Sequence, residues 1–183
     1  HYVEAIYPLQ FYPAANKKSG KDLSVVYTSL HGTGITMVPL ALHSWGFTNI
    51  YLVAEQVLPD GSFPTVAYPN PEDPKALEMG IALLRKRKAD LLIATDPDTD
   101  RVGIVVNHHG VPHILNGNQI ASICAQHICN ALYSQNKMPG HGAFVKTIAT
   151  TELFKAIVES YKIPCFDVLT GFKYIAELIN RWE

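Results

Sequence analysis

Three aspartates at alternate positions, Asp96, Asp98 and Asp100, directly follow a short apolar run that predicts a buried strand. Carboxylates this close together repel one another unless a cation lies among them. Oxygen ligands of this kind suit a hard divalent cation, Mg²⁺ above all, and exclude the metals that prefer thiolates. Arg101 follows at once, and its planar guanidinium is suited to phosphate oxygens. The segment therefore predicts a Mg²⁺ site for phosphoryl-transfer chemistry.

Other interpretations of this segment rest on the same residues. A calcium-binding EF-hand needs Gly at its sixth position and Glu at its twelfth, where this sequence has Arg101 and Asn107, so it is excluded. A phosphatase of the haloacid-dehalogenase type would use Asp98 as the nucleophile and Asp100 as the acid. The local pattern fits, although such a nucleophile normally follows the first strand of its fold. A non-enzymatic metal-binding module and a metal-free polar turn also stay open.

The loop at residues 31–34 (HGTG) is a second candidate site, because it lies between a predicted strand and a predicted helix. Backbone N–H groups at the start of a helix can bind an anion. The two glycines could equally serve only a tight connection. Lys146 and Lys173 are isolated cations, which are usually solvated but can approach a phosphate.

The elements that must position these residues alternate along the chain from residue 21 onward. Strands are expected at residues 23–27, 50–53, 90–94, 102–106, 144–148 and 165–168. Helices are expected up to residue 45, at 74–88, from 118 onward, at 152–161 and at 172–182. The predicted fold class is α/β, with two consecutive three-layer α/β/α units of mixed, largely parallel sheets, covering residues 1–110 and 111–183.

Helical periodicity also predicts which side chains face the cores. Asp73 and Pro74 are expected to open the 74–88 helix as N-cap and first residue. The side chains expected to be buried are Leu77, Ile81 and Leu84 in this helix, Ile120, Ile123, Cys124 and Ile128 in the next, and Phe172, Ile175, Ile179 and Trp182 in the last.

The composition narrows the class of protein. Of the 183 residues, 48% are hydrophobic, and 15 Lys+Arg against 16 Asp+Glu give a net charge of −1. A nucleic-acid surface needs a basic excess, and a membrane-spanning helix needs about 20 consecutive apolar residues, so neither partner is expected. Cys124, Cys129 and Cys165 form no metal or disulfide pattern and are expected to be buried thiols in the cytoplasm. The chain begins without a signal-peptide pattern or an initiator Met, which suggests a piece of a longer protein.

Several segments resemble, in order and spacing, the motifs of the α-D-phosphohexomutase family, which includes phosphoglucomutases and phosphomannomutases. Residues 96–103 (DPDTDRVG) resemble the metal loop of that family, and residues 27–34 (YTSLHGTG) resemble its loop after the first strand of the second domain. Further similar segments are FPTV at 63–66, PNPE at 69–72, GNQ at 117–119, KTI at 146–148 and TGFK at 170–173. The last two are similar to the phosphopentomutase-like branch.

The resemblance implies a fold, a reaction and a set of site residues. Family members have four domains, and this chain corresponds to the second (residues 1–110) and part of the third (residues 111–183). A phosphoserine gives its phosphoryl group to a sugar phosphate, and the bisphosphate then returns the other one, which makes the enzyme an isomerase. By resemblance, the metal ligands are Asp96, Asp98 and Asp100, the phosphate-binding residues Arg101 and His31, and the substrate-binding residues Thr170, Gly171 and Lys173.

The resemblance also implies what this chain lacks. The serine lies in the first domain, the sugar loop of the third domain is absent, and the fourth domain supplies a phosphate loop. The expected partners are therefore the first and fourth domains of the same polypeptide and a phosphosugar substrate, glucose or mannose phosphate. The chain alone is expected to be inactive, and the preferred sugar depends on the absent loop.

Overall fold

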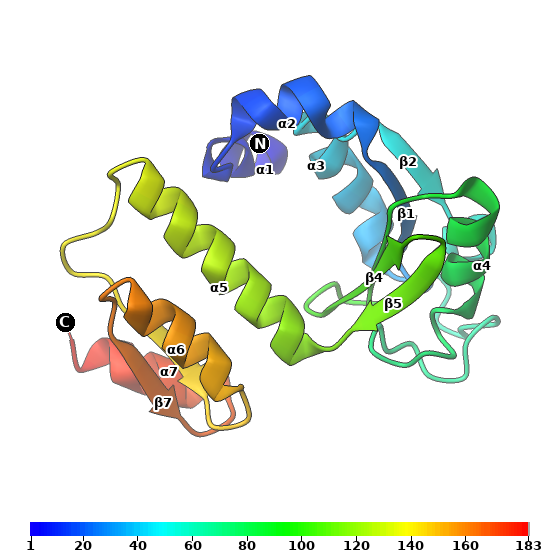
Figure 1. The fold of residues 1–183 in the computed structure, drawn as a ribbon. Helices are drawn as coiled ribbons and strands as arrows, with labels where there is room; N and C mark the ends of the chain where they lie inside the picture. The colour runs from blue at the N-terminus through cyan, green and yellow to red at the C-terminus, as the bar shows by residue number, and fades with distance from the viewer. Residues whose placement is uncertain (183) are drawn as a thin grey trace. The chain divides into compact units, whose positions relative to one another are not determined.

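The computed structural model describes residues 1–182, which form two compact units, His1–Gly117 and a second unit that begins at Asn118 (Figure 1). Each unit has its own sheet and its own hydrophobic core. The predicted α/β fold class is confirmed, because strands and helices alternate along the chain in both units.

The first unit contains a mixed sheet with the strand order β2-β1-β3-β4-β5. Its strands are β1 (Ser24–Thr28), β2 (Asn49–Leu52), β3 (Leu91–Thr95), β4 (Val102–His108) and β5 (Val111–Leu115). The strand β1 pairs in parallel with β2 and β3, whereas β3–β4 and β4–β5 are antiparallel. Parallel strands are buried on both faces, and β1 accordingly has four consecutive buried residues.

The strand β5 belongs to the first compact unit, which extends to Gly117. His109 and Gly110 form a two-residue turn with positive φ at both positions, the geometry that suits a tight hairpin. The chain therefore folds back onto β4 before it leaves for the second unit at Gly117. The strands expected from the sequence did not include this returning strand.

The helices of the first unit are α1 (Tyr2–Ile6), α2 (Pro13–Ser19), α3 (Val38–Ser44) and α4 (Glu78–Arg87). Short 3₁₀ segments lie at Tyr7–Leu9, Gly20–Asp22, Thr33–Thr36 and Ala54–Gln56. The helix α4 begins later than predicted: Asp73 caps a turn by accepting from the amide of Lys75, and tight turns continue until Glu78. It ends at Lys88, which adopts the left-handed conformation.

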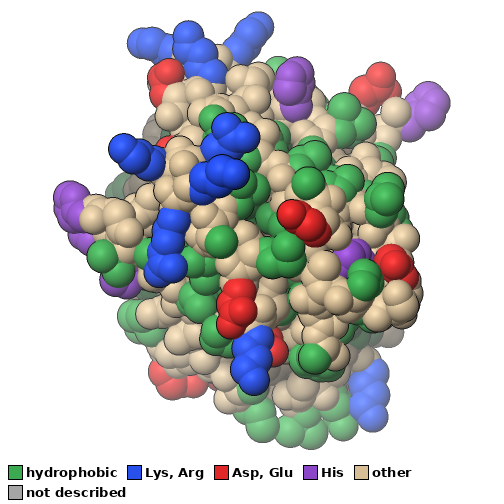
Figure 2. Space-filling view, turned by 90° about the vertical axis from the view of Figure 1, so that its right-hand side faces the viewer, with side chains coloured by type: hydrophobic (Ala, Val, Ile, Leu, Met, Phe, Trp, Pro, Cys, Tyr) green, Lys and Arg blue, Asp and Glu red, His purple; other side chains and the backbone are tan. Residues whose placement is uncertain are grey.

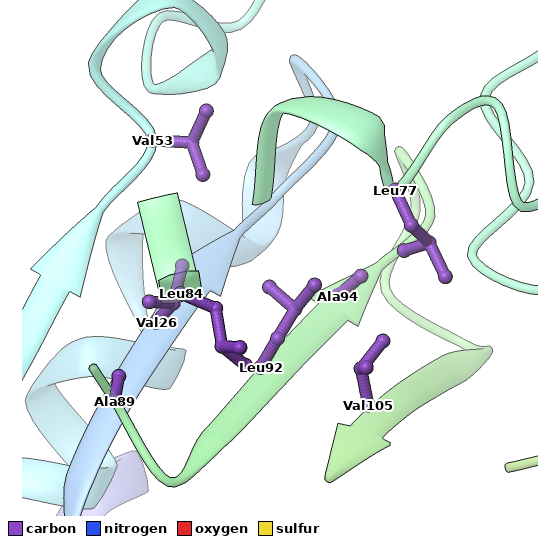
Figure 3. Close-up of a cluster of buried hydrophobic side chains, with 8 residues drawn as sticks. All are labelled: Val26, Val53, Leu77, Leu84, Ala89, Leu92, Ala94 and Val105. Atoms are coloured by element: carbon purple, nitrogen blue, oxygen red, sulfur yellow. The ribbon is translucent and has the colours of Figure 1, made fainter. Parts of the chain in front are cut away.

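The core of the first unit lies between α4 and the sheet (Figure 3). Leu77 and Leu84 are fully buried, and Ile81 packs against them, as the helical spacing predicted. The buried residues of this core are Val26, Val53, Leu77, Leu84, Ala89, Leu92, Ala94 and Val105. Strand β3, which leads into the aspartates, is therefore held by packing against α4.

The second unit contains two parallel strands, β6 (Phe144–Thr147) and β7 (Cys165–Val168), and the helices α5 (Gly117–Ser134), α6 (Glu152–Ser160) and α7 (Phe172–Asn180). Its core is formed by Ala125, Cys129, Val158, Ile163 and Cys165. The buried face of α5 carries small residues, among them Ser122 and Ala125, because they allow close packing.

Several large side chains of the second unit are more exposed than predicted. Ile123 is 56% exposed and Cys124 is also exposed, so the buried stripe of α5 is shifted from the one expected. Phe172 and Trp182 are 87% and 48% exposed, although the spacing predicted them in the core. Periodicity identifies the face of a helix but not whether another element of the same unit covers it.

The surface carries charges of both signs. On the face shown in Figure 2, acidic side chains lie among the Lys and Arg side chains. The basic end of α4 is exposed, and Arg87 stacks over the ring of Tyr51 at 4.8 Å. Among the described residues, no helix has the length and apolar character needed to cross a bilayer.

The first prediction concerns the close contact between the proline-rich segment before α4 and strand β4. A Cβ atom at Gly103 would lie 1.9 Å from the carbonyl oxygen of Pro71, which is backbone and cannot swing away. We expect Gly103→Ala to destabilise the unit by about 1–3 kcal/mol, the usual cost of overpacking. Chemical denaturation measures this change. Gly61→Ala is the matched control, because nothing lies within 4 Å of its added methyl group. Equal stability of the two variants would contradict the contact.

The second prediction concerns Asp90, which joins the starts of β1 and β3. Its Oδ2 accepts from the amide and the hydroxyl of Ser24 at 2.8 and 2.6 Å, and these bonds lower the pKa of Asp90. A carboxyl with a lower pKa in the folded state stabilises the fold above its unfolded pKa of about 3.9, and this stabilisation is lost as the pH falls through the folded pKa.

We therefore expect the unaltered chain to lose more stability than Asp90→Asn as the pH falls below about 4. Melting temperatures recorded over a pH series measure the difference. Ser24→Ala removes one of the donors and should fall between the two. If the melting temperatures of Asp90→Asn and of the unaltered chain fell equally at acid pH, these bonds would not lower the pKa of Asp90.

Candidate functional site

The three aspartates converge in the turn that connects β3 to β4. One ligand oxygen from each of Asp96, Asp98 and Asp100 lies within 4.8 Å of the other two. Asp96 is fully buried at the end of β3, whereas Asp98 and Asp100 are exposed. One buried and two exposed carboxylates thus surround a single point at the edge of the first unit.

Both oxygens of Asp96 are held by Arg101. The backbone N–H of Arg101 donates to Oδ1 at 3.0 Å, and its Nε donates to Oδ2 at 2.7 Å. Burial by itself raises the pKa of Asp96, but these bonds and a contact with Asp98 outweigh it and hold the pKa below its ordinary value. Asp96 is therefore ionised and fixed in place, and Arg101, whose side chain also bonds Tyr68, remains half-exposed.

The exposed carboxylates carry charge that Arg101 does not fully neutralise. The negative charge of Asp98 raises the pKa of Asp100, although Arg101 acts in the opposite direction at 3.7 Å. Converging carboxylates whose charges are not fully compensated stand to gain from a divalent cation. The donor set is oxygen only, as Mg²⁺ requires, and two of its members are open to solvent.

The HGTG loop supports the aspartate turn through its backbone. The amide and the hydroxyl of Thr33 both donate to the carbonyl of Pro97, at 2.9 and 3.1 Å. A Cβ at Gly32 would lie 2.3 Å from the Cα of Pro97, so only glycine permits this approach. Sequence reasoning left open an anion site or a tight connection, and the structure shows a third role, contact with the turn that carries Asp98.

His31 is buried, with both ring nitrogens near partners within the chain. Its Nε2 lies 2.8 Å from the hydroxyl of Thr65 and its Nδ1 lies 3.3 Å from the carbonyl of Leu58. The fully buried Gln56 joins the same network, accepting from Thr28 at 2.6 Å and donating to Thr65 at 3.0 Å. The imidazole therefore holds the proline-rich segment, and no sequence signal identified Gln56.

The predicted substrate residues lie in the second unit, where the loop after β7 leads into the first turn of α7. Gly171 precedes α7 with a φ of +132°, a conformation that favours glycine. The ammonium group of Lys173 lies 4.8 Å from the centre of the Tyr174 ring. Thr170 and Gly171 thus lie on one loop and Lys173 lies in the first turn of α7, in a different unit from the aspartates.

Lys146 is not a solvated surface lysine. Its side chain is 2% exposed, and its Nζ contacts Asp167 at 2.5 Å, Glu152 at 2.9 Å and the carbonyl of Thr150 at 3.1 Å. The bonds to Asp167 and Glu152 hold its pKa above the ordinary value. Lys155 contacts the other oxygen of Asp167 at 3.1 Å. The pairing follows the β6–β7 register, in which Lys146 is opposite Asp167.

Comparisons with known proteins also divide the chain into two consecutive parts. The profile described as "Phosphoglucomutase/phosphomannomutase, alpha/beta/alpha domain II" matches residues 1–110, and the one for domain III matches residues 116–183. The phosphoglucomutase of Staphylococcus aureus (strain USA300) is 40% identical over 163 residues, which are 88% of this chain and 29% of that protein.

Two solved structures share the fold of this chain. A protein from Thermus thermophilus described as a phosphomannomutase is 27% identical, with a TM-score of 0.72 over 98% of this chain and 38% of its own. A phosphoglucomutase/phosphomannomutase family protein from Burkholderia thailandensis shares the fold at 20% identity, with a TM-score of 0.68 over 96% of this chain and 36% of its own. The two matched profiles, over residues 1–110 and 116–183, show that the chain belongs to the phosphoglucomutase/phosphomannomutase family.

Proposed function

We propose that this chain carries the metal site and one substrate loop of a Mg²⁺-dependent phosphosugar mutase, an intramolecular phosphotransferase of the isomerase class. The observation that supports this most strongly is the convergence of three carboxylates beside the guanidinium of Arg101. Family membership supports the reaction class, and the chain spans 29% of the length of the curated relatives it matches.

Asp96, Asp98 and Asp100 would hold the cation in this proposal. Bound Mg²⁺ supplies charge neutralisation and polarisation of a phosphoryl oxygen. Arg101 would bind the transferring phosphate through its half-exposed guanidinium, which Asp96 holds in place at Nε. Phosphoryl transfer needs mainly positioning and electrostatic stabilisation from the protein, which a buried carboxylate and a fixed guanidinium provide.

The second unit would bind the sugar phosphate, glucose or mannose phosphate, through Thr170, Gly171 and Lys173. The phosphoserine lies outside this chain in the proposal, and the first and fourth domains of the same polypeptide complete the site. His31 acts indirectly, by fixing the segment that packs against the HGTG loop. We place the enzyme in the cytoplasm, in keeping with three cysteines that form no disulfide within the described residues.

A phosphatase with Asp98 as nucleophile is the competing proposal. The family matches favour the mutase, because both profiles and the curated relatives are phosphoglucomutase or phosphomannomutase sequences. The two proposals differ for the chain alone: a phosphatase would hydrolyse a chromogenic phosphate ester, and Asp98→Asn would abolish that activity. A mutase fragment without its serine would not hydrolyse the ester.

The third prediction is cation binding by the aspartates. We expect the chain to bind Mg²⁺ and Mn²⁺ weakly, with a dissociation constant of roughly 10⁻⁴–10⁻³ M, because few protein ligands are present. Asp98→Asn should weaken binding at least 10-fold, since it removes one ligand charge. Electron paramagnetic resonance of Mn²⁺, with Mg²⁺ as competitor, measures both values.

Asp22→Asn removes the same charge from the 3₁₀ segment before β1 and is the matched control, which should bind as the unaltered chain does. Tight binding by the chain alone would favour the metal-binding module instead. If Asp98→Asn left the dissociation constants for Mg²⁺ and Mn²⁺ unchanged, the proposed metal site would be wrong.

The fourth prediction tests the reaction itself. A chimera in which this chain replaces the matching segment of the Staphylococcus aureus phosphoglucomutase should interconvert glucose 1-phosphate and glucose 6-phosphate, whereas the chain alone should not. In the chimera, Asp98→Asn and Arg101→Ala should each lower kcat by about 10²–10³-fold, the usual cost of losing one group that stabilises transition-state charge. A coupled dehydrogenase assay measures turnover. A chimera that folds, binds Mg²⁺ and still does not turn over would contradict the proposed reaction.

A further inference from the structure

Thr99, between two of the proposed metal ligands, has an unusual backbone. Its φ is +66°, in the left-handed region. Of the described non-glycine residues with positive φ, Thr99 is the only one with a β-branched side chain. β-Branched residues rarely adopt this conformation, so the surrounding structure must enforce it.

The side chain of Thr99 lies close to Gly34, in the loop that supports the turn. A Cβ at Gly34 would lie 2.9 Å from the hydroxyl oxygen of Thr99, 2.7 Å from that of Thr95 and 2.4 Å from that of Tyr27. Three hydroxyl-bearing side chains therefore surround the space that a side chain at Gly34 would occupy. The hydroxyl of Thr99 is buried and has no hydrogen-bond partner among the described residues, so the side chain of Thr99 is held by packing alone.

The left-handed conformation determines where the neighbouring carboxylates point. The amide of Thr99 donates to the carbonyl of Asp96 at 3.1 Å, and two residues later the amide of Arg101 donates to the Asp96 side chain at 3.0 Å. The segment thus curls around Asp96. Asp98 and Asp100 lie on either side of Thr99, and their carboxylates converge on that of Asp96. In an extended chain without this reversal, the turn would not close on Asp96.

We propose that Thr99, packed against Gly34, is a positioning residue that determines the size selectivity of the cation site. This inference rests on the proposed metal site and names no new ligand. Mg²⁺ requires oxygen ligands at 2.0–2.1 Å in a near-octahedral arrangement, whereas Ca²⁺ accepts 2.3–2.6 Å and irregular geometry, so a stiff loop favours the smaller ion. A loop without the Thr99 side chain can open and accept the larger one.

The test compares Thr99→Gly with Thr99→Val. Glycine keeps positive φ accessible but removes the side chain that packs against Gly34. Valine keeps the branched shape and replaces the unpartnered hydroxyl with a methyl group. The affinities for Mg²⁺ and Ca²⁺ are measured separately for each variant by NMR titration of the chain, and folding is checked by chemical denaturation of the same samples.

We expect the Mg²⁺/Ca²⁺ affinity ratio to fall about 5- to 10-fold in Thr99→Gly and to remain within 2-fold in Thr99→Val. A change in stability alone would alter both affinities together and leave their ratio unchanged, so the ratio isolates positioning. A ratio in Thr99→Gly equal to that of the unaltered chain, or an equal fall in Thr99→Val, would overturn the inference while leaving the metal site intact. Failure of the unaltered chain to bind either cation would overturn the metal site itself, and the inference with it.

Discussion

The arrangement of the first unit depends on keeping one buried carboxylate ionised. Asp96 lies at the end of a strand packed in the core, where an unpaired charge would be strongly unfavourable. Arg101 meets that requirement twice, with its backbone and with its guanidinium, and in doing so bends the intervening residues into a turn. The same pair of bonds therefore stabilises the end of β3, shapes the turn and orients the arginine toward solvent.

Local spacing was sufficient to predict the principal features of this site. Alternate aspartates after an apolar run mark the end of a buried strand, and β3 does end at Thr95. The alternation of strands and helices indicated the fold class, because each pattern reflects side-chain burial within a few neighbouring residues. The convergence of Asp96, Asp98 and Asp100 could be expected because their mutual repulsion calls for a compensating cation.

Features that depend on contacts between distant segments could not be predicted. The burial of Lys146 depends on Asp167, which lies on a neighbouring strand, and the role of His31 depends on Thr65 and Leu58. Phe172 belongs to an amphipathic helix whose apolar side is uncovered within its own unit. In each case the sequence gives the type of side chain, but the residue that it contacts depends on strand register or on the path of a loop.

The near-contact of Pro71 with Gly103 connects two regions that are separate in the sequence. Gly103 follows Arg101 by one intervening residue, so the proline-rich segment rests directly on the strand that leaves the aspartate turn. An insertion or deletion in that segment would shift the backbone at Gly103 and so displace Arg101, although no residue beside Arg101 is altered. A transplant of the aspartate turn into another scaffold should therefore include the proline-rich segment, because the turn alone would lack the backbone that packs against Gly103.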